Sequence, residues 1–246
     1  MAHNYPVPMG KAIRAVLSGL SMALLTPNRV GEMATRVFVL PKEHRLKGIW
    51  LGSLSGLAQT VVTLLFGLVG GSMLLTTNSD INIAILSNNY LILSLGISGG
   101  IIVLACYFYL HRIVEWISSW KWLPFSKGNY LVLKLVSIRD KWKLLGLAAL
   151  KYCVYLNQFF LIIIVCDVPI TWVQGLMTLS VIYLILTFIP VAALADVGVR
   201  GSVTLLVIGL YADLPVNLLA ASLLLWVINI AIPSLIGLIL LNKIKF

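Results

Sequence analysis

Charged side chains are scarce in this chain of 246 residues, where they make up 11 % of the sequence and acidic residues number only 8. A soluble domain carries about 25 % charged residues. Hydrophobic residues make up 60 % and the mean hydropathy is +1.02. A water-soluble globule of this size keeps about a quarter to a third of its unfolded surface exposed, so it could not hide this much apolar surface. The composition excludes a soluble enzyme and a disordered tail, and it predicts an integral membrane protein.

Cysteine is also rare, and Cys106, Cys153 and Cys166 all lie inside apolar runs. Their odd number and their spacing exclude a disulfide scaffold and a cysteine metal site, so we expect all three to be structural. Residues 1–10 contain no apolar stretch, so we expect no signal peptide.

Motifs for catalysis are missing too. The chain has no P-loop, no GxSxG, no HExxH and no dinucleotide fingerprint. We therefore expect no cofactor, no metal and no nucleotide hydrolysis, and the balance is against an enzyme. The net charge of +10 bears on membrane sidedness rather than on nucleic acid, for which we expect no role.

What the sequence has in abundance is long apolar runs. Four are long enough to cross about 30 Å of hydrocarbon, namely 48–75, 90–110, 144–166 and 214–241. Two further stretches, 11–40 and 172–211, are interrupted at Pro27 and Pro190, where a helix should end or kink. We predict one all-α membrane domain over 1–246, with about four spans.

Positive charge is sorted along the connecting segments. Lys and Arg gather in 41–47, in 111–143 and at the C-terminus. In contrast, the only charged residues in 76–89, 167–171 and 212–217 are acidic. The positive-inside rule places the basic segments and the C-terminus in the cytoplasm. Both ends of 11–40 are then cytoplasmic and both ends of 172–211 are outside. These stretches are predicted to be re-entrant hairpins of opposite orientation, a probable inverted repeat with a polar cavity between their tips.

The basic segment 111–143 is the longest connection. Within it, residues 130–143 are short, basic and partly amphipathic. We expect a helix there that lies in the cytoplasmic interface and is attracted by anionic lipid, with a solvated loop as the alternative.

Ionisable residues inside membrane segments are costly and are functional candidates. In the first hairpin these are Arg29, Glu32 and Arg36, with Asn28 beside them, and in the second they are Asp196 and Arg200. Each acid precedes an arginine by four residues, so each pair can form on one helix face. One interpretation is that each pair only neutralises itself. The other is that the arginines meet a lipid phosphate, which suits the guanidinium fork, with free N–H groups near Gly31 adding to the anion site.

Polar residues in the spans supply the remaining candidates. Lys151 and Gln158 share one face of 144–166, Gln59 lies in a stripe along 48–75, and Asn229 lies near Pro233 in 214–241. Lys151 could instead extend to the interface, and the amides could simply join helices.

The interrupted stretches resemble a known family. Residues 27–36 read Pro-Asn-Arg-Val-Gly-Glu-Met-Ala-Thr-Arg. This resembles the Pro-x-Arg-x-Gly-Glu-x-x-Arg signature of the lysylphosphatidylglycerol synthase transmembrane-region family, also called flippase-like. Pro190 followed by Gly198-Val199-Arg200 is similar to its second signature, and residues 151–158 and 226–233 fit the rest of the pattern.

The resemblance implies a multi-pass inner-membrane protein that moves an aminoacylated or glycosylated lipid between leaflets. Three departures accompany it. Gly201 stands where many members have Glu. The chain begins almost at the first hairpin, where members have one or two earlier spans, which leaves open a fragment or a late start codon. The aminoacyl-transferase domain of the synthases is absent, so the resemblance does not extend to lysyl-lipid synthesis.

We therefore expect a translocator of an anionic lipid headgroup, with membrane lipids as its partners. Two alternatives stay open. One is a membrane enzyme that uses Glu32 or Asp196 as a base on a lipid-linked substrate. The other is a scaffold for a separate lipid-modifying enzyme. The lipid, the coupling and the oligomeric state do not follow from the sequence.

Overall fold

The computed structural model describes residues 7–26, 30–38, 40–77, 89–118, 129–192 and 194–241, which form helices joined by turns, with no strand among them. In chain order the helices are α1 (Met9–Leu25), α2 (Val30–Phe38), α3 (Lys42–Thr77), α4 (Asn89–Phe108), α5 (Leu110–Ser118), the 3₁₀ helix η3 (Asn129–Leu135), α6 (Ile138–Val165), α7 (Trp172–Phe188), α8 (Asp196–Ile208), α9 (Pro215–Trp226), the π-helical turn η4 (Val227–Ala231) and α10 (Ile232–Leu241). The all-α prediction is confirmed.

Several helices are long and apolar enough to cross a membrane. Among the described residues these are α3, α6 and the continuous Pro215–Leu240 helix formed by α9 and α10. The α4–α5 pair makes a fourth if it is one span, bent by 72°. A helix rises 1.5 Å per residue, so about 20 residues cover the hydrocarbon core. The chain is membrane-embedded, as its composition predicts.

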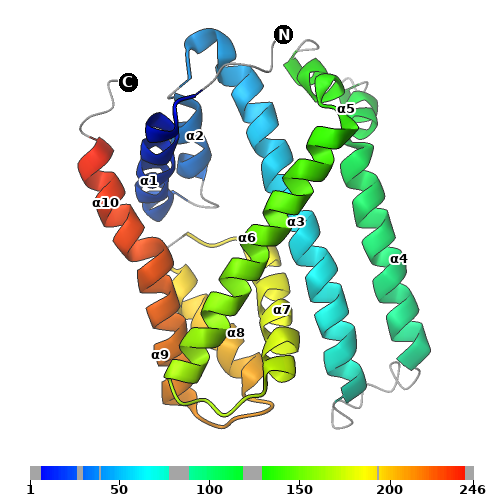
Figure 1. Cartoon of the computed structure of the whole chain (residues 1–246), viewed down its shortest axis with the longest axis vertical. Coiled ribbons are helices and arrows are strands. Elements are labelled where there is room, and N and C mark those ends of the chain that lie inside the picture. The colour runs from blue at the N-terminus through cyan, green and yellow to red at the C-terminus, as the bar shows by residue number, and fades with distance from the viewer. Residues whose placement is uncertain are drawn as a thin grey trace.

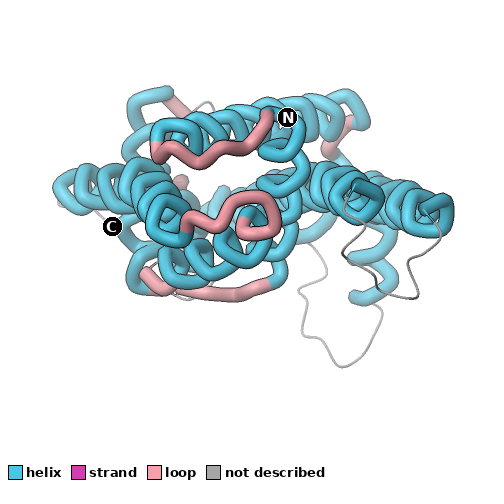
Figure 2. The backbone as a smooth tube through the Cα atoms, turned by 90° about the horizontal axis from the view of Figure 1, so that it is seen from below, coloured by secondary structure: helices cyan, strands magenta, loops and turns pink. Residues whose placement is uncertain are grey.

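Two hairpins of shorter helices lie between these long helices (Figure 1). The α1–α2 hairpin descends from the end of the molecule where α3 begins, and the α7–α8 hairpin rises from the opposite end. The end of α7 and the start of α8 lie near mid-height in this view. Seen along the long axis, the helices form a flattened bundle (Figure 2).

Proline determines where the first limb of each hairpin stops. Thr26 precedes Pro27 and has an extended backbone, with φ −115° and ψ 137°. Ile189 precedes Pro190 and is also extended, with φ −99° and ψ 102°. The proline ring disfavours the helical conformation of the residue before it, so α1 and α7 end at these positions.

Small residues dock the hairpins onto the long helices. A Cβ atom on Gly237 of α10 would clash with the Leu17 carbonyl oxygen of α1, so only glycine allows this approach. Ser21 of α1 also donates a 2.6 Å hydrogen bond to the Ser234 carbonyl of α10. On the other hairpin, α7 packs against Gly70 of α3, where an added Cβ would meet Ser180 at 2.7 Å. Such close contacts replace the hydrophobic driving force that is missing between helices in lipid.

The prediction of one interfacial helix over 130–143 is wrong. The segment divides into η3 and the first turns of α6, with Val136 and Ser137 between them. Ser137 separates η3 from α6, because it is the N-cap residue of α6. Its side-chain oxygen accepts a hydrogen bond from the Asp140 N–H at 3.1 Å. The basic residues Arg139, Lys141 and Lys143 therefore lie in the first turns of the spanning helix, before the apolar run that begins at residue 144.

Candidate functional site

The second limb of each hairpin carries an acid–arginine ion pair. On α8, the Asp196 carboxylate accepts hydrogen bonds from Arg200 Nη2 at 2.8 Å and Nε at 3.3 Å. The Arg200 and Asp196 side chains are 12 % and 9 % exposed. Asp196 is the first residue of α8, where the positive end of the helix dipole favours its charge. The predicted Asp196–Arg200 pair therefore forms, and it is largely buried.

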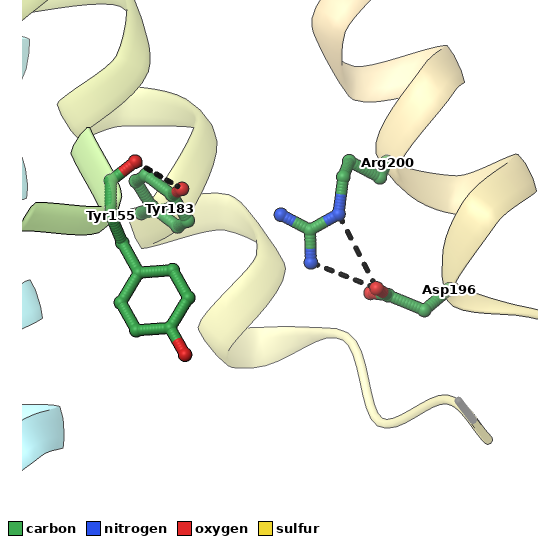
Figure 3. Close-up of polar contacts among 4 residues, drawn as sticks. All are labelled: Tyr155, Tyr183, Asp196 and Arg200. Atoms are coloured by element: carbon green, nitrogen blue, oxygen red, sulfur yellow. Dashed lines mark hydrogen bonds and ion pairs between the residues drawn. The ribbon is translucent and has the colours of Figure 1, made fainter. Parts of the chain in front are cut away.

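Arg200 is aimed at two tyrosines on neighbouring helices (Figure 3). Its guanidinium points from α8 toward Tyr155 of α6 and Tyr183 of α7, whose hydroxyl donates a 3.3 Å hydrogen bond to the Tyr155 carbonyl. Arginine has five N–H donors. Arg200 uses two of these donors, both in hydrogen bonds to Asp196, within the described part of the chain. Three donors therefore remain for an anion.

The corresponding pair in the first hairpin is Glu32 and Arg36 on α2. Arg36 Nη2 donates to Glu32 Oε1, and the Arg36 side chain is 46 % exposed against 16 % for Glu32. The α2 backbone is held close to α1, since a Cβ on Gly19 would lie 3.0 Å from the Glu32 carbonyl oxygen. The acid is therefore fixed in the hairpin, while the arginine reaches outward.

The start of α2 departs from the expected anion site. The Gly31 N–H was predicted to be among free donors, but it donates a 2.9 Å hydrogen bond to Thr26 Oγ1. Thr26 closes the turn and satisfies this N–H from within the hairpin. Asn28 and Arg29, the other predicted residues of this turn, lie outside the described residues.

A polar contact joins the two full-length helices beside the hairpins. Asn229 Nδ2 donates a 3.1 Å hydrogen bond to Gln158 Oε1, which links η4 to α6. Asn229 lies inside the π-helical turn, four residues before Pro233. Proline lacks the N–H that would bond the Asn229 carbonyl, which accounts for irregular helix at this point. The contact favours the interpretation that these amides join helices.

Lys151 and Gln59 belong to neither of the two acid–arginine pairs on α2 and α8. Lys151 is exposed on α6, and its Nζ lies 5.6 Å from the centre of the Tyr155 ring, within range of a cation–π interaction. Tyr155 is therefore in contact with Lys151 and lies on the side toward which the Arg200 guanidinium points. Gln59 is half-buried on α3, and the structure describes no hydrogen bond between its side chain and another candidate residue.

Sequence reasoning missed Tyr183. A single tyrosine in an apolar run has no polar pattern around it, and its contact with Tyr155 arises only when α6 and α7 pack together. The acidic partners of the two arginines can be predicted from the four-residue spacing alone, because both pairs lie within one helical turn.

No metal site is evident among the described residues, which contain no group of three His, Cys, Asp or Glu side chains able to hold an ion. Comparison of the chain with protein-family profiles, with curated proteins and with solved structures gave no match.

Proposed function

We propose that the α1–α2 and α7–α8 hairpins are re-entrant and enter the membrane from opposite faces. Their limbs contain 17, 9, 17 and 13 residues. At 1.5 Å per residue these helices are about 14–26 Å long, short of the roughly 30 Å hydrocarbon core. Non-helical backbone at that depth is tolerated where it is buried in protein or faces a polar cavity.

The distribution of charged residues predicts how this arrangement is oriented in the membrane. The start of α3 and the start of α6 carry Lys42, Arg45 and Arg139 at the same end of the molecule. Asp167 and Asp213 lie in the turns at the opposite end. By the positive-inside rule the basic end and the C-terminus are cytoplasmic. The protein is then a multi-pass protein of the cell inner (plasma) membrane.

In this arrangement the protein translocates an anionic, aminoacylated or glycosylated lipid between leaflets. The observation that supports this most is Arg200, whose side chain is largely buried and retains three N–H donors. Arg200 lies four residues, or about 6 Å, along α8 from the hairpin turn. A guanidinium binds a phosphate oxygen pair with parallel hydrogen bonds. Arg36 would provide the equivalent contact from the other hairpin.

The remaining candidates serve the same path. Asp196 and Glu32 hold the two arginines in orientation. Lys151 extends the positive charge along α6, while the Gln158–Asn229 contact fixes the helices beside it. Because the chain has no nucleotide-binding motif, movement is downhill or coupled to an ion.

The enzyme alternative receives no support from these contacts. A catalytic base needs a carboxylate that is free to take a proton, whereas both hairpin carboxylates are paired with arginine. The resemblance of both hairpin sequences to the flippase-like family agrees with translocation. A separate lipid-modifying enzyme would be a partner that supplies the lipid.

The proposal is tested by leaflet accessibility in liposomes. Purified protein is reconstituted with head-labelled fluorescent phosphatidylglycerol, its lysylated form or a glycosylated lipid, and a membrane-impermeant reductant is added. We expect at least one lipid to lose its inner-leaflet fluorescence, which protein-free vesicles and heat-denatured protein retain. Folded protein that leaves all three lipids protected would contradict the proposal.

A further inference from the structure

A second polar region lies away from the hairpins, at the bend between α4 and α5. With η3 and the start of α6, this α4–α5 elbow lines an open cavity of about 950 Å³. Small-molecule sites typically have volumes of about 300–1,000 Å³. The cavity lies at the basic end of the molecule, where α5 and the start of α6 are found (Figure 1).

The lining of this cavity is positively charged. Its basic side chains are His111, Arg112, Lys134 and Lys141, and its acid is Glu115. Lys134 Nζ lies 2.8 Å from Glu115 Oε1, so these two charges offset each other. Arg112 and Lys141 are left as an excess of positive charge, and aromatic rings of Phe108, Tyr109 and Trp142 surround them.

Lys141 is the buried cation of this cavity. Its residue is 5 % exposed, yet its ammonium forms no ion pair with a carboxylate in the described part of the chain. It donates a 2.6 Å hydrogen bond to the carbonyl of Phe108, the last residue of α4. Tyr107 donates back to the Lys141 carbonyl at 3.2 Å and fixes the two helices. A buried charge without a counter-charge is costly, and an anion in the cavity would remove that cost.

An apolar groove continues from the cavity. Between α3 and α4 the groove occupies about 440 Å³ and is lined by Leu68, Met73, Ile97 and other apolar residues. Ile101 and Leu104 line both the groove and the cavity. A charged pocket that adjoins an apolar groove has the form of an amphiphile with an anionic head.

We propose that the α4–α5 elbow binds an anionic phospholipid, with its phosphate beside Arg112 and Lys141 and an acyl chain in the α3–α4 groove. The site is distinct from the hairpins, and it does not depend on translocation. Loss of activity in the liposome assay would leave it standing, since binding here is measured directly.

The test is lipid retention in detergent, measured by native mass spectrometry during titration with phosphatidylglycerol. The Arg112→Gln/Lys141→Gln variant, which removes the two proposed phosphate contacts, is compared with Arg139→Gln/Lys143→Gln. The control loses the same charge at the same end and also loses an exposed ion pair, Lys143–Asp140 at 3.8 Å. We expect roughly tenfold weaker binding by the first variant only, the effect of losing charge-assisted contacts. Equal losses in both variants would show unspecific attraction and overturn the proposal.

The groove is tested with Ile101→Trp and its matched control Leu161→Trp. Both residues are 62 % exposed, but only Ile101 lines the groove. We expect Ile101→Trp to weaken phosphatidylglycerol binding several-fold and Leu161→Trp to leave it unchanged. Soluble glycerol 3-phosphate should compete poorly because it lacks the chain. Full competition by it, or no effect of Ile101→Trp, would overturn the lipid assignment.

Discussion

Vesicles that contain the Arg36→Gln/Arg200→Gln variant are expected to protect inner-leaflet lipid almost as well as vesicles without protein. In the proposed function each arginine gives the headgroup phosphate charge-assisted hydrogen bonds, which are worth about 1.5–3 kcal/mol each. Losing one such contact slows transfer by roughly tenfold or more, and two independent losses multiply. The rate of fluorescence loss after reductant addition measures the effect.

The single variants separate the two hairpins. Arg200 is the more buried of the two, with 12 % of its side chain exposed against 46 % for Arg36, so Arg200→Gln should slow transfer more than Arg36→Gln. Arg139→Gln/Lys143→Gln is the charge-matched control, because both residues are exposed at the start of α6. If the hairpin double variant transfers lipid at the wild-type rate while folded, the arginines have no part in translocation.

Asp196→Ala is expected to destabilise the protein by about 3–5 kcal/mol. The substitution leaves the guanidinium of Arg200 without its acid in a site where only 12 % of that side chain is exposed. Thermal unfolding of the purified protein in detergent, followed by intrinsic fluorescence, measures the loss as a lower midpoint. Asp196→Ala/Arg200→Leu should recover much of it, because the double variant removes the orphaned charge.

An exposed pair of the same length provides the control. Lys134 and Glu115 are also 2.8 Å apart, but their side chains are 39 % and 49 % exposed. Glu115→Ala should therefore cost less than about 1 kcal/mol. A midpoint that falls equally in Asp196→Ala and Glu115→Ala would mean that burial of the Asp196–Arg200 pair has no special energetic role.

The parts of this fold that follow from the sequence are local. The apolar run 144–166 lies almost wholly within α6, and Pro190 accounts for the end of α7 at Phe188. Spacing of four residues anticipated the geometry of Asp196–Arg200, because one helical turn brings such residues together. The helices α3 and α6 begin before the apolar runs 48–75 and 144–166, since basic residues are good helix formers that hydropathy alone treats as loop.

The parts that did not follow depend on packing between distant segments. The Gln158–Asn229 and Tyr183–Tyr155 contacts require α6 to lie beside two other elements. The 72° bend after Phe108 has no proline to announce it, and Lys141 supplies a donor for the exposed carbonyl from 33 residues away. The Gly31 N–H is not free, because its partner Thr26 Oγ1 stands five residues earlier, after the end of α1, and helix periodicity does not relate the two residues.

The most direct test of the account is the sidedness of four positions. Single cysteines replace Lys11, Lys42, Pro169 or Asp213, all exposed, in a variant without the three native cysteines. An impermeant maleimide is then applied to intact and to permeabilised cells. We predict that positions 169 and 213 are labelled from outside and that positions 11 and 42 are labelled only after permeabilisation. Labelling of 11 and 42 from opposite sides, or of 169 and 213 from opposite sides, would show a hairpin that crosses the membrane and would contradict the account.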